Sequence, residues 1–293
     1  MRTLGRWALV AGGLAVMVMC PAARAADEVR RLPVETYVSK MKAGRIGQMA
    51  GVGGGGKSKP VLKPGVNVLK LPDKIHAKTK FLTQEFIYYQ PKGLKPSEKA
   101  PLFFFLHGIG GRGNDINPWA DRLSQKPREW FKYLDQHGIV TIFPQCALGD
   151  QSKSIAGKKG DGWWQPVDLS LLLLYVAKTY NIDKNRIYLS GFSMGAFGTW
   201  SWAIETPRTF AAVVPVAGGG DPKRVGVLRN VPIWVFHGAK DTRVPPSRSQ
   251  VMVDALRKAG SNKVKFTIDP DKGHSASGFN KPELYEWLVK QKK

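Results

Sequence analysis

Three polar side chains that lie far apart in the chain have the types needed to activate a hydroxyl group for attack on a carbonyl carbon. Ser193 is the centre of a Gly-x-Ser-x-Gly motif at residues 191–195, and Asp241 and His274 follow it in that order. A serine hydroxyl is a weak nucleophile near neutral pH, so it needs a base that takes its proton and an acid that orients the base. The order Ser, Asp, His accompanies this motif when it forms a strand-to-helix turn. Such a set would transfer an acyl group to the serine and then hydrolyse it.

The segments on either side of Ser193 predict that turn. A β-prone apolar run leads into the motif, and a helix-like run from Ala196 to Ile204 leaves it. In this arrangement the serine hydroxyl is exposed, and the helix N-terminus behind it favours developing negative charge. Gly191 and Gly195 fit the turn because side chains there would collide with neighbouring backbone. The alternative is a chance match of the five letters in a glycine-rich chain.

The positions of His274 and Asp241 suit a base and its orienting acid. His274 lies in a polar loop, residues 271–278, whereas a core histidine more often lies within an apolar run. Asp241 lies just past the carboxyl end of an apolar run, residues 232–237, and is the preferred acid. Asp221, in a loop after another strand, is the second candidate. The structural alternative for Asp241 is a turn residue or a helix cap.

A glycine-rich loop is the candidate for stabilising the oxyanion of a tetrahedral intermediate. Residues 107–113 read His-Gly-Ile-Gly-Gly-Arg-Gly and directly follow a buried apolar run, residues 102–106. Glycines there let backbone N–H groups face a substrate oxygen without obstruction. The expected donors are the amides of Ile109 and Met194. His107, at the strand end, is expected to hold the loop rather than to act as the base.

The remaining histidines and cysteines predict no metal site. The five histidines are dispersed, and neither a His-Glu-x-x-His pattern nor a paired-cysteine spacing occurs. His237 is expected to anchor a loop, and His76 and His137 are expected to lie outside the site. Cys146 is interpreted as a buried apolar residue because no activating neighbour is evident. No cofactor is expected.

Apolar patterning predicts one large α/β domain. Strands alternate with helices, which indicates a mainly parallel sheet with helices on both faces and a ligand site at the carboxyl ends of the strands. The expected strands are 81–90, 102–106, 139–143, the run into Ser193, 211–217, 232–237 and 264–268. The expected helices are 119–136, broken or kinked at Pro127, then 167–180, 196–204, 246–259 and 282–290.

The N-terminal third begins with the pattern of an export signal. Arg2 and Arg6 precede an apolar run, residues 7–19, and small residues predict cleavage after Ala25. Residues 1–25 are therefore expected to be a signal peptide that directs the chain to the periplasm or the exterior.

A basic arm rich in Gly, Lys and Pro is expected at residues 26–65, before a catalytic domain at 66–293. Residues 51–58 match the letters of a phosphate-binding loop. The flanking residues predict neither the strand nor the helix that such a loop requires, which favours a flexible tether over nucleotide binding.

The chain is strongly basic. Lys and Arg number 45 against 22 Asp and Glu, which gives a formal net charge of +23. Such a field attracts polyanions weakly, but the basic residues are scattered and no nucleic-acid-binding motif is present. The apolar run near the N-terminus is short for a membrane span, so stable insertion is not expected.

Five blocks together resemble a known group of enzymes. They are residues 106–110 (Leu-His-Gly-Ile-Gly), 183–188 (Asp-Lys-Asn-Arg-Ile-Tyr), 191–195 (Gly-Phe-Ser-Met-Gly), 236–241 (Phe-His-Gly-Ala-Lys-Asp) and 273–274 (Gly-His). The set resembles secreted bacterial α/β hydrolases of the phospholipase/carboxylesterase and "predicted peptidase" type, which are related to polyhydroxybutyrate depolymerase-like and feruloyl esterase-like enzymes. The resemblance covers residues 80–293 and implies the α/β-hydrolase fold with Ser193, Asp241 and His274 as the triad.

Three functions are consistent with these residues. The preferred one is a secreted serine esterase acting on small-molecule or polymer-linked esters. The others are a serine peptidase with the same triad and a non-catalytic binding protein on the same scaffold. Trp163 and Trp164 close a long polar loop, residues 144–166, and are candidate substrate contacts because indole rings stack on sugars and aromatic groups. The alternative is that both rings pack beneath that loop.

Overall fold

The computed structural model describes residues 62–95, 97–148, 154–155, 158–159 and 163–293. Three predicted segments lie wholly or mostly outside these residues. They are the signal peptide (1–25), the arm (26–65) and, within the arm, the segment that matches a phosphate-binding loop (51–58). Strand β1 (Gly65–Lys70) opens the described fold, one residue before the predicted start of the catalytic domain. Residues 149–153, 156–157 and 160–162 of the long polar loop 144–166 also lie outside them, and the described part of that loop contains a short antiparallel pair formed by β5 (Ser154–Ile155) and β6 (Lys158–Lys159).

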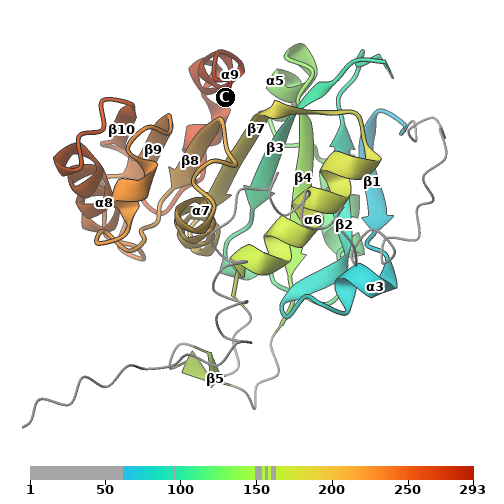
Figure 1. The fold of residues 1–293 in the computed structure, drawn as a ribbon, viewed down its shortest axis with the longest axis horizontal. Helices are drawn as coiled ribbons and strands as arrows, with labels where there is room; N and C mark the ends of the chain where they lie inside the picture. The colour runs from blue at the N-terminus through green and yellow to red at the C-terminus, as the bar shows by residue number, and fades with distance from the viewer. Residues whose placement is uncertain (1–61, 96, 149–153, 156–157, 160–162) are drawn as a thin grey trace, which may run out of the picture.

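An eight-stranded mixed sheet forms the centre of the molecule (Figure 1), with the order β1-β2-β4-β3-β7-β8-β9-β10. Strands β1 and β2 pair antiparallel with each other, and β2 pairs antiparallel with β4. All other neighbours are parallel. The further strands are β2 (Leu82–Gln90), β3 (Ala100–Leu106), β4 (Val140–Cys146), β7 (Ile182–Phe192), β8 (Ala212–Val216), β9 (Ile233–Gly238) and β10 (Val264–Asp269). The prediction of a mainly parallel sheet is confirmed.

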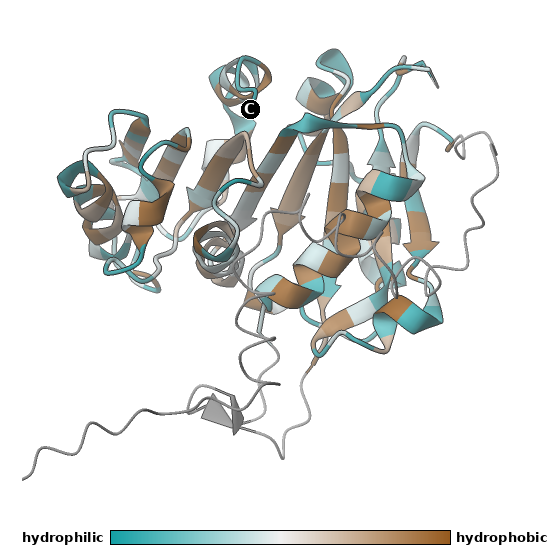
Figure 2. Cartoon of the chain, in the orientation of Figure 1, coloured by the Kyte–Doolittle hydropathy of each residue, from teal (hydrophilic) through white to brown (hydrophobic). Residues whose placement is uncertain are grey.

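Helices cover both faces of this sheet, as the alternating pattern predicted. Helices α6 (Pro166–Thr179), α7 (Met194–Glu205) and α8 (Ser247–Lys258) share one hydrophobic cluster with the strands. The opposite cluster contains α4 (Asn117–Gln125), α5 (Phe131–Gln136) and α9 (Pro282–Val289). Parallel strands buried on both faces must be apolar along their length, and Figure 2 shows the central strands as largely hydrophobic.

Adjacent residues of β3 illustrate how one strand serves two cores. Leu102 and Phe104 pack in the cluster with α6 and α7, whereas Phe103 packs in the cluster with α4, α5 and α9. The Phe104 ring meets Trp202 of α7 edge-on at 5.3 Å between centroids. Successive side chains of a strand point to opposite faces, so a continuous apolar run is required here rather than an alternating one.

The predicted helical region 119–136 is two helices. Helix α4 ends at Gln125 and α5 begins at Phe131, with Pro127 between them. Proline disfavours helical geometry in the residue before it and lacks the N–H of a helical ladder, which explains the break.

The other predicted strands and helices are present with bounds shifted by a few residues. The sequence did not predict β1 or the one-turn helix α3 (Asp73–His76). Within the ranges given above, no helix is long and apolar enough to span a bilayer.

Candidate active site

Ser193 occupies the turn between β7 and α7. Its backbone has φ 56° and ψ −118°, a conformation that non-glycine residues rarely adopt. The Ser193 N–H donates a hydrogen bond of 2.9 Å to the carbonyl of Val216 at the end of β8. Strained backbone of this kind persists only where the surroundings hold it, and here it directs the hydroxyl away from the sheet.

The two glycines of the motif allow close backbone packing around that turn. A Cβ on Gly195 would overlap the carbonyl oxygen of Leu106, at the end of β3. A Cβ on Gly191 would overlap the carbonyl of Gly195. Neither glycine has a positive φ, so glycine is required here for space rather than for an unusual backbone conformation.

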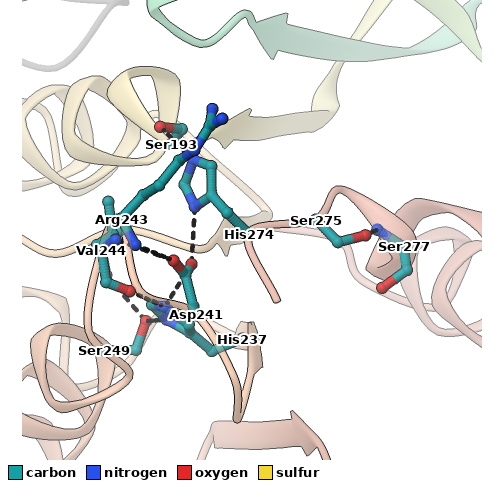
Figure 3. Close-up of polar contacts among 10 residues, drawn as sticks. Ser193, His237, Asp241, Arg243, Val244, Ser249, His274, Ser275 and Ser277 are labelled. Atoms are coloured by element: carbon teal, nitrogen blue, oxygen red, sulfur yellow. Dashed lines mark hydrogen bonds and ion pairs between the residues drawn. The ribbon is translucent and has the colours of Figure 1, made fainter. Parts of the chain in front are cut away.

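The structure brings Ser193, His274 and Asp241 into one hydrogen-bonded line. His274 Nε2 lies 2.9 Å from Ser193 Oγ, and His274 Nδ1 lies 2.7 Å from Asp241 Oδ2 (Figure 3). Because Asp241 can only accept, Nδ1 carries the proton and Nε2 of the neutral ring is free to accept the serine proton. The Phe192 ring packs against the His274 ring at 4.8 Å between centroids and supports its orientation.

The Asp241 carboxylate is fully buried and well supplied with donors. Its Oδ1 accepts hydrogen bonds of 2.9 Å from the backbone N–H groups of Arg243 and Val244. Burial by itself would raise the pKa of Asp241, but the hydrogen bonds from Val244, His274 and Arg243 outweigh it and the pKa is lowered. Asp241 is therefore an anion when His274 accepts a proton from Ser193.

Sequence reasoning missed these two backbone donors. An aspartate that accepts from the N–H groups two and three residues later forms a local turn, and the Asp-x-Arg-Val spacing was a usable indication of it. It also missed that His237 approaches Asp241, with Nε2 3.3 Å from Oδ2. No local pattern indicates that contact, because it depends on how the loop after β9 folds back.

The predicted oxyanion loop lies beside Ser193. A single 3₁₀ turn, Ile109–Gly111, follows β3, and a Cβ on Gly108 would lie 3.4 Å from the Ser193 Cβ. The amides of Ile109 and Met194 donate no hydrogen bond to any residue in the described ranges. These are the two N–H groups that the sequence analysis predicts as oxyanion donors, one from the loop beside Ser193 and one from the residue that follows it.

His107 holds this loop, in agreement with the role expected for it. Its Nε2 accepts a hydrogen bond of 3.0 Å from the Cys146 N–H, so Nδ1 carries the proton and donates to the Gly108 carbonyl at 2.7 Å. Burial lowers the pKa of His107 to about 4, with the charge of Arg112 adding to the effect. His107 is therefore neutral at physiological pH and buried away from solvent.

The two tryptophans after the long loop have different environments. Trp164 is only 3% exposed, its Nε1–H donates to the His107 carbonyl at 3.2 Å, and its ring leaves room only for glycine at position 198. It packs beneath the glycine-rich loop 107–113 and is not accessible to a substrate, which corrects its assignment as a substrate contact. Trp163 is half-buried with its ring 6.2 Å from Phe197, and it stays a candidate contact.

The other candidates lie apart from this site. Asp221 is exposed and accepts a hydrogen bond from the Lys223 N–H, so it does not approach His274.

Cys146 is buried, and burial raises the pKa of its thiol to about 12, which makes it unreactive. In the described part of the chain no three His, Cys, Asp or Glu side chains lie close enough to hold a metal ion.

Comparison with known proteins relates this chain to two groups of hydrolases. Residues 222–291, which include Asp241 and His274, match the model of the prolyl oligopeptidase family. A bifunctional acetylxylan esterase/xylanase from Neocallimastix patriciarum is 32% identical over 153 residues, covering 52% of this chain. A poly(3-hydroxyalkanoate) depolymerase from Paucimonas lemoignei is 28% identical over 139 residues, covering 44% of this chain.

The chain spans only part of the length of these relatives, 21% of the first and 30% of the second. Among solved structures, a thermostable esterase superposes with a TM-score of 0.59 at 29% identity, covering 78% of this chain and 63% of the other. The structural similarity thus extends well beyond the residues that the family model matches.

Proposed function

We propose that this chain, which belongs to the α/β hydrolases of the esterase and prolyl oligopeptidase group, is a serine hydrolase that cleaves carboxylic esters. The observation that carries the proposal is the hydrogen-bonded line from Ser193 through His274 to Asp241, with two unused amides beside the hydroxyl. This arrangement supplies a nucleophile, a base, an orienting acid and an oxyanion site within one small region.

The reaction follows from these positions. Ser193 Oγ attacks the acyl carbon while His274 Nε2 takes the hydroxyl proton, and the amides of Ile109 and Met194 stabilise the oxyanion. The tetrahedral intermediate collapses, the C–O bond to the alcohol breaks, and His274 gives its proton to the departing oxygen. Water then attacks the acyl-enzyme with His274 again as base. The acid leaves and the proton returns to Ser193 Oγ.

Relatives favour an ester over an amide as the substrate. The acetylxylan esterase and the thermostable esterase are named for ester cleavage, and both are about 30% identical to this chain in the aligned region. We therefore propose esters on a carbohydrate or of an aromatic acid as the substrate class. Trp163, beside Phe197, would contact the sugar or the aromatic ring.

A serine peptidase is the second candidate, because the matching family model is that of the prolyl oligopeptidases. The same triad cleaves amides, so labelling by a fluorophosphonate would not distinguish the two. Matched p-nitrophenyl ester and p-nitroanilide substrates with the same acyl group would distinguish an esterase from a peptidase. Ester turnover with no measurable anilide turnover supports the esterase.

The decisive variant is Ser193→Ala in the purified mature protein. We expect p-nitrophenyl acetate turnover to fall to background while circular dichroism and the melting temperature stay close to those of the unchanged protein. The hydroxyl itself forms the acyl-enzyme, so no other residue can replace it. Undiminished turnover would contradict the proposal, and failure of a fluorophosphonate to label Ser193 would favour a non-catalytic binding protein.

We also propose that the chain is exported. The support is the pattern of residues 1–25 alone. Sequencing the N-terminus of protein recovered from a bacterial host is the test. A mature chain starting at Ala26 in the periplasmic fraction supports export, and retention of Met1 in the cytoplasm contradicts it.

A further inference from the structure

A second histidine lies on the side of Asp241 away from Ser193. The side chains of His237 and Asp241 are both fully buried. His237 Nε2 lies 2.8 Å from the Val244 carbonyl and 3.3 Å from Asp241 Oδ2. His237 Nδ1 lies 2.7 Å from Ser249 Oγ, which in turn lies 2.9 Å from the Gly218 carbonyl (Figure 3).

Counting protons in this chain of contacts limits the states that His237 can adopt. Both neighbours of Nε2 are acceptors, so Nε2 must carry a proton. Ser249 has one proton, which either reaches the Gly218 carbonyl or points at His237 Nδ1. Only when Nδ1 also carries a proton can both contacts of the Ser249 hydroxyl, with His237 Nδ1 and with the Gly218 carbonyl, be hydrogen bonds. Every polar group is then satisfied, and His237 is an imidazolium.

The charges around His237 favour that state. Its one ionisable contact in the described ranges is Asp241, whose negative charge is buried beside it. In the hydrogen bonds of His237 and Ser249, the segment after β8 provides the Gly218 carbonyl and α8 provides the Ser249 hydroxyl, and neither group is charged. On the neighbouring strand β10, Ile268 is the residue opposite His237, and the ion pair of Lys240 with Asp271 is exposed. A buried carboxylate with a nearby imidazolium avoids an uncompensated buried charge.

We propose that His237 is a positioning residue that holds the Asp241 carboxylate as an imidazolium, so that this carboxylate is shared between two imidazoles. The inference rests on the proposed hydrolase function, and His237 touches neither substrate nor reacting atoms. Its positive charge offsets part of the pull that Asp241 exerts on the proton of His274. Without that charge, Asp241 would attract the proton of His274 more strongly.

His237→Gln tests this with activity. The glutamine amide can donate to the Val244 carbonyl and Asp241 as Nε2 does, but it carries no charge. We expect the acidic limb of kcat/KM for p-nitrophenyl acetate to move upward by about 1 pH unit, the scale of a nearby charge in a buried site. If kcat falls but the acidic limb of the kcat/KM profile stays at the same pH, His237 has a structural role only and the proposal is overturned. His76→Gln, which removes a histidine bonded to the Leu82 carbonyl outside the site, should leave the limb in place.

A second measurement does not depend on activity, and its deciding result comes from the unchanged protein. The unchanged protein, labelled with ¹⁵N in its histidine rings, should show one ring with protons on both nitrogens at pH 7.5, slow to exchange because the ring is buried. These two resonances should be absent from His237→Gln. A spectrum in which every ring is singly protonated at that pH overturns the proposal. The outcome is the same whether the site cleaves esters or not, so this result is separate from the test of the function.

Discussion

At the scale of single residues, the ionised state of Asp241 is the condition on which the site depends. Four donors point at its two oxygens, from the Arg243 and Val244 amides and from the rings of His274 and His237. Charge-assisted hydrogen bonds of this kind are stronger than neutral ones. They fix the carboxylate, and the carboxylate fixes which nitrogen of His274 carries the proton.

Asp241→Asn should separate orientation from packing. Asparagine has nearly the same shape, but its amide can donate to His274 Nδ1 and so favours the wrong tautomer. We expect kcat to fall by about 10³- to 10⁴-fold, the scale of the loss when the acid of a Ser-His-Asp triad is replaced by its amide. Steady-state kinetics with p-nitrophenyl acetate measure this. A decrease of less than about tenfold would show that His274 does not rely on Asp241.

The effect of Asp241→Asn on the free energy of unfolding should depend on pH. The pKa of Asp241 is lowered in the folded state, so its ionised form stabilises the fold above the unfolded-state pKa of about 3.9. That contribution is lost as the pH falls through the lower folded-state pKa. Urea unfolding should therefore show a difference between Asp241 and Asp241→Asn proteins at pH 7 that shrinks towards pH 3.

At the scale of elements, the site depends on how closely α7 approaches the end of β3. The carbonyl of Leu106 lies where a Cβ of Gly195 would be, so the first turn of the helix is pressed against the strand that carries the oxyanion loop. On the other side, the Lys240 N–H donates to the Lys272 carbonyl at 2.9 Å and joins the loop of Asp241 to the loop of His274. Backbone contacts thus set the distances between the loops that carry Ser193, Asp241 and His274.

Gly195→Ala tests the first of these contacts. The added methyl overlaps backbone that cannot rotate away, so we expect a loss of about 1–3 kcal/mol in the free energy of unfolding, together with a large loss of esterase activity. Gly226→Ala is a suitable control, because its methyl would meet only the Ala259 Cβ at 3.3 Å. Equal unfolding midpoints and activities for the two variants would contradict the packing argument.

At the scale of the whole molecule, the net charge of +23 gives the chain a positive electrostatic field. Arg243 contributes to it at the site itself, since it is exposed and Figure 3 shows its side chain extending from the Asp241 loop towards Ser193. Long-range attraction of this kind raises association rates and is screened by salt, with a Debye length of about 10 Å at 0.1 M.

An anionic ester should therefore be more sensitive to salt than a neutral one. We expect kcat/KM for mono-p-nitrophenyl succinate to fall about threefold or more between roughly 0.02 and 0.5 M NaCl, whereas that for p-nitrophenyl butyrate changes little. Arg243→Gln should weaken the salt dependence for the anionic ester alone. Parallel salt profiles for the two esters would show that the field does not act at the site.

The sequence by itself determined most of the strands and helices and the order of Ser193, Asp241 and His274 along the chain. Continuous apolar runs such as 102–106 specify buried parallel strands, and the letters around Ser193 specify a tight turn, because both effects are local. Tertiary structure decided which distant groups meet. The choice of Asp241 over Asp221, the burial of Trp164 beneath the oxyanion loop and the approach of His237 to Asp241 all depend on contacts between segments separated along the chain. Local preferences do not encode such contacts, since they arise only when the strands align and their carboxyl ends share one edge of the sheet.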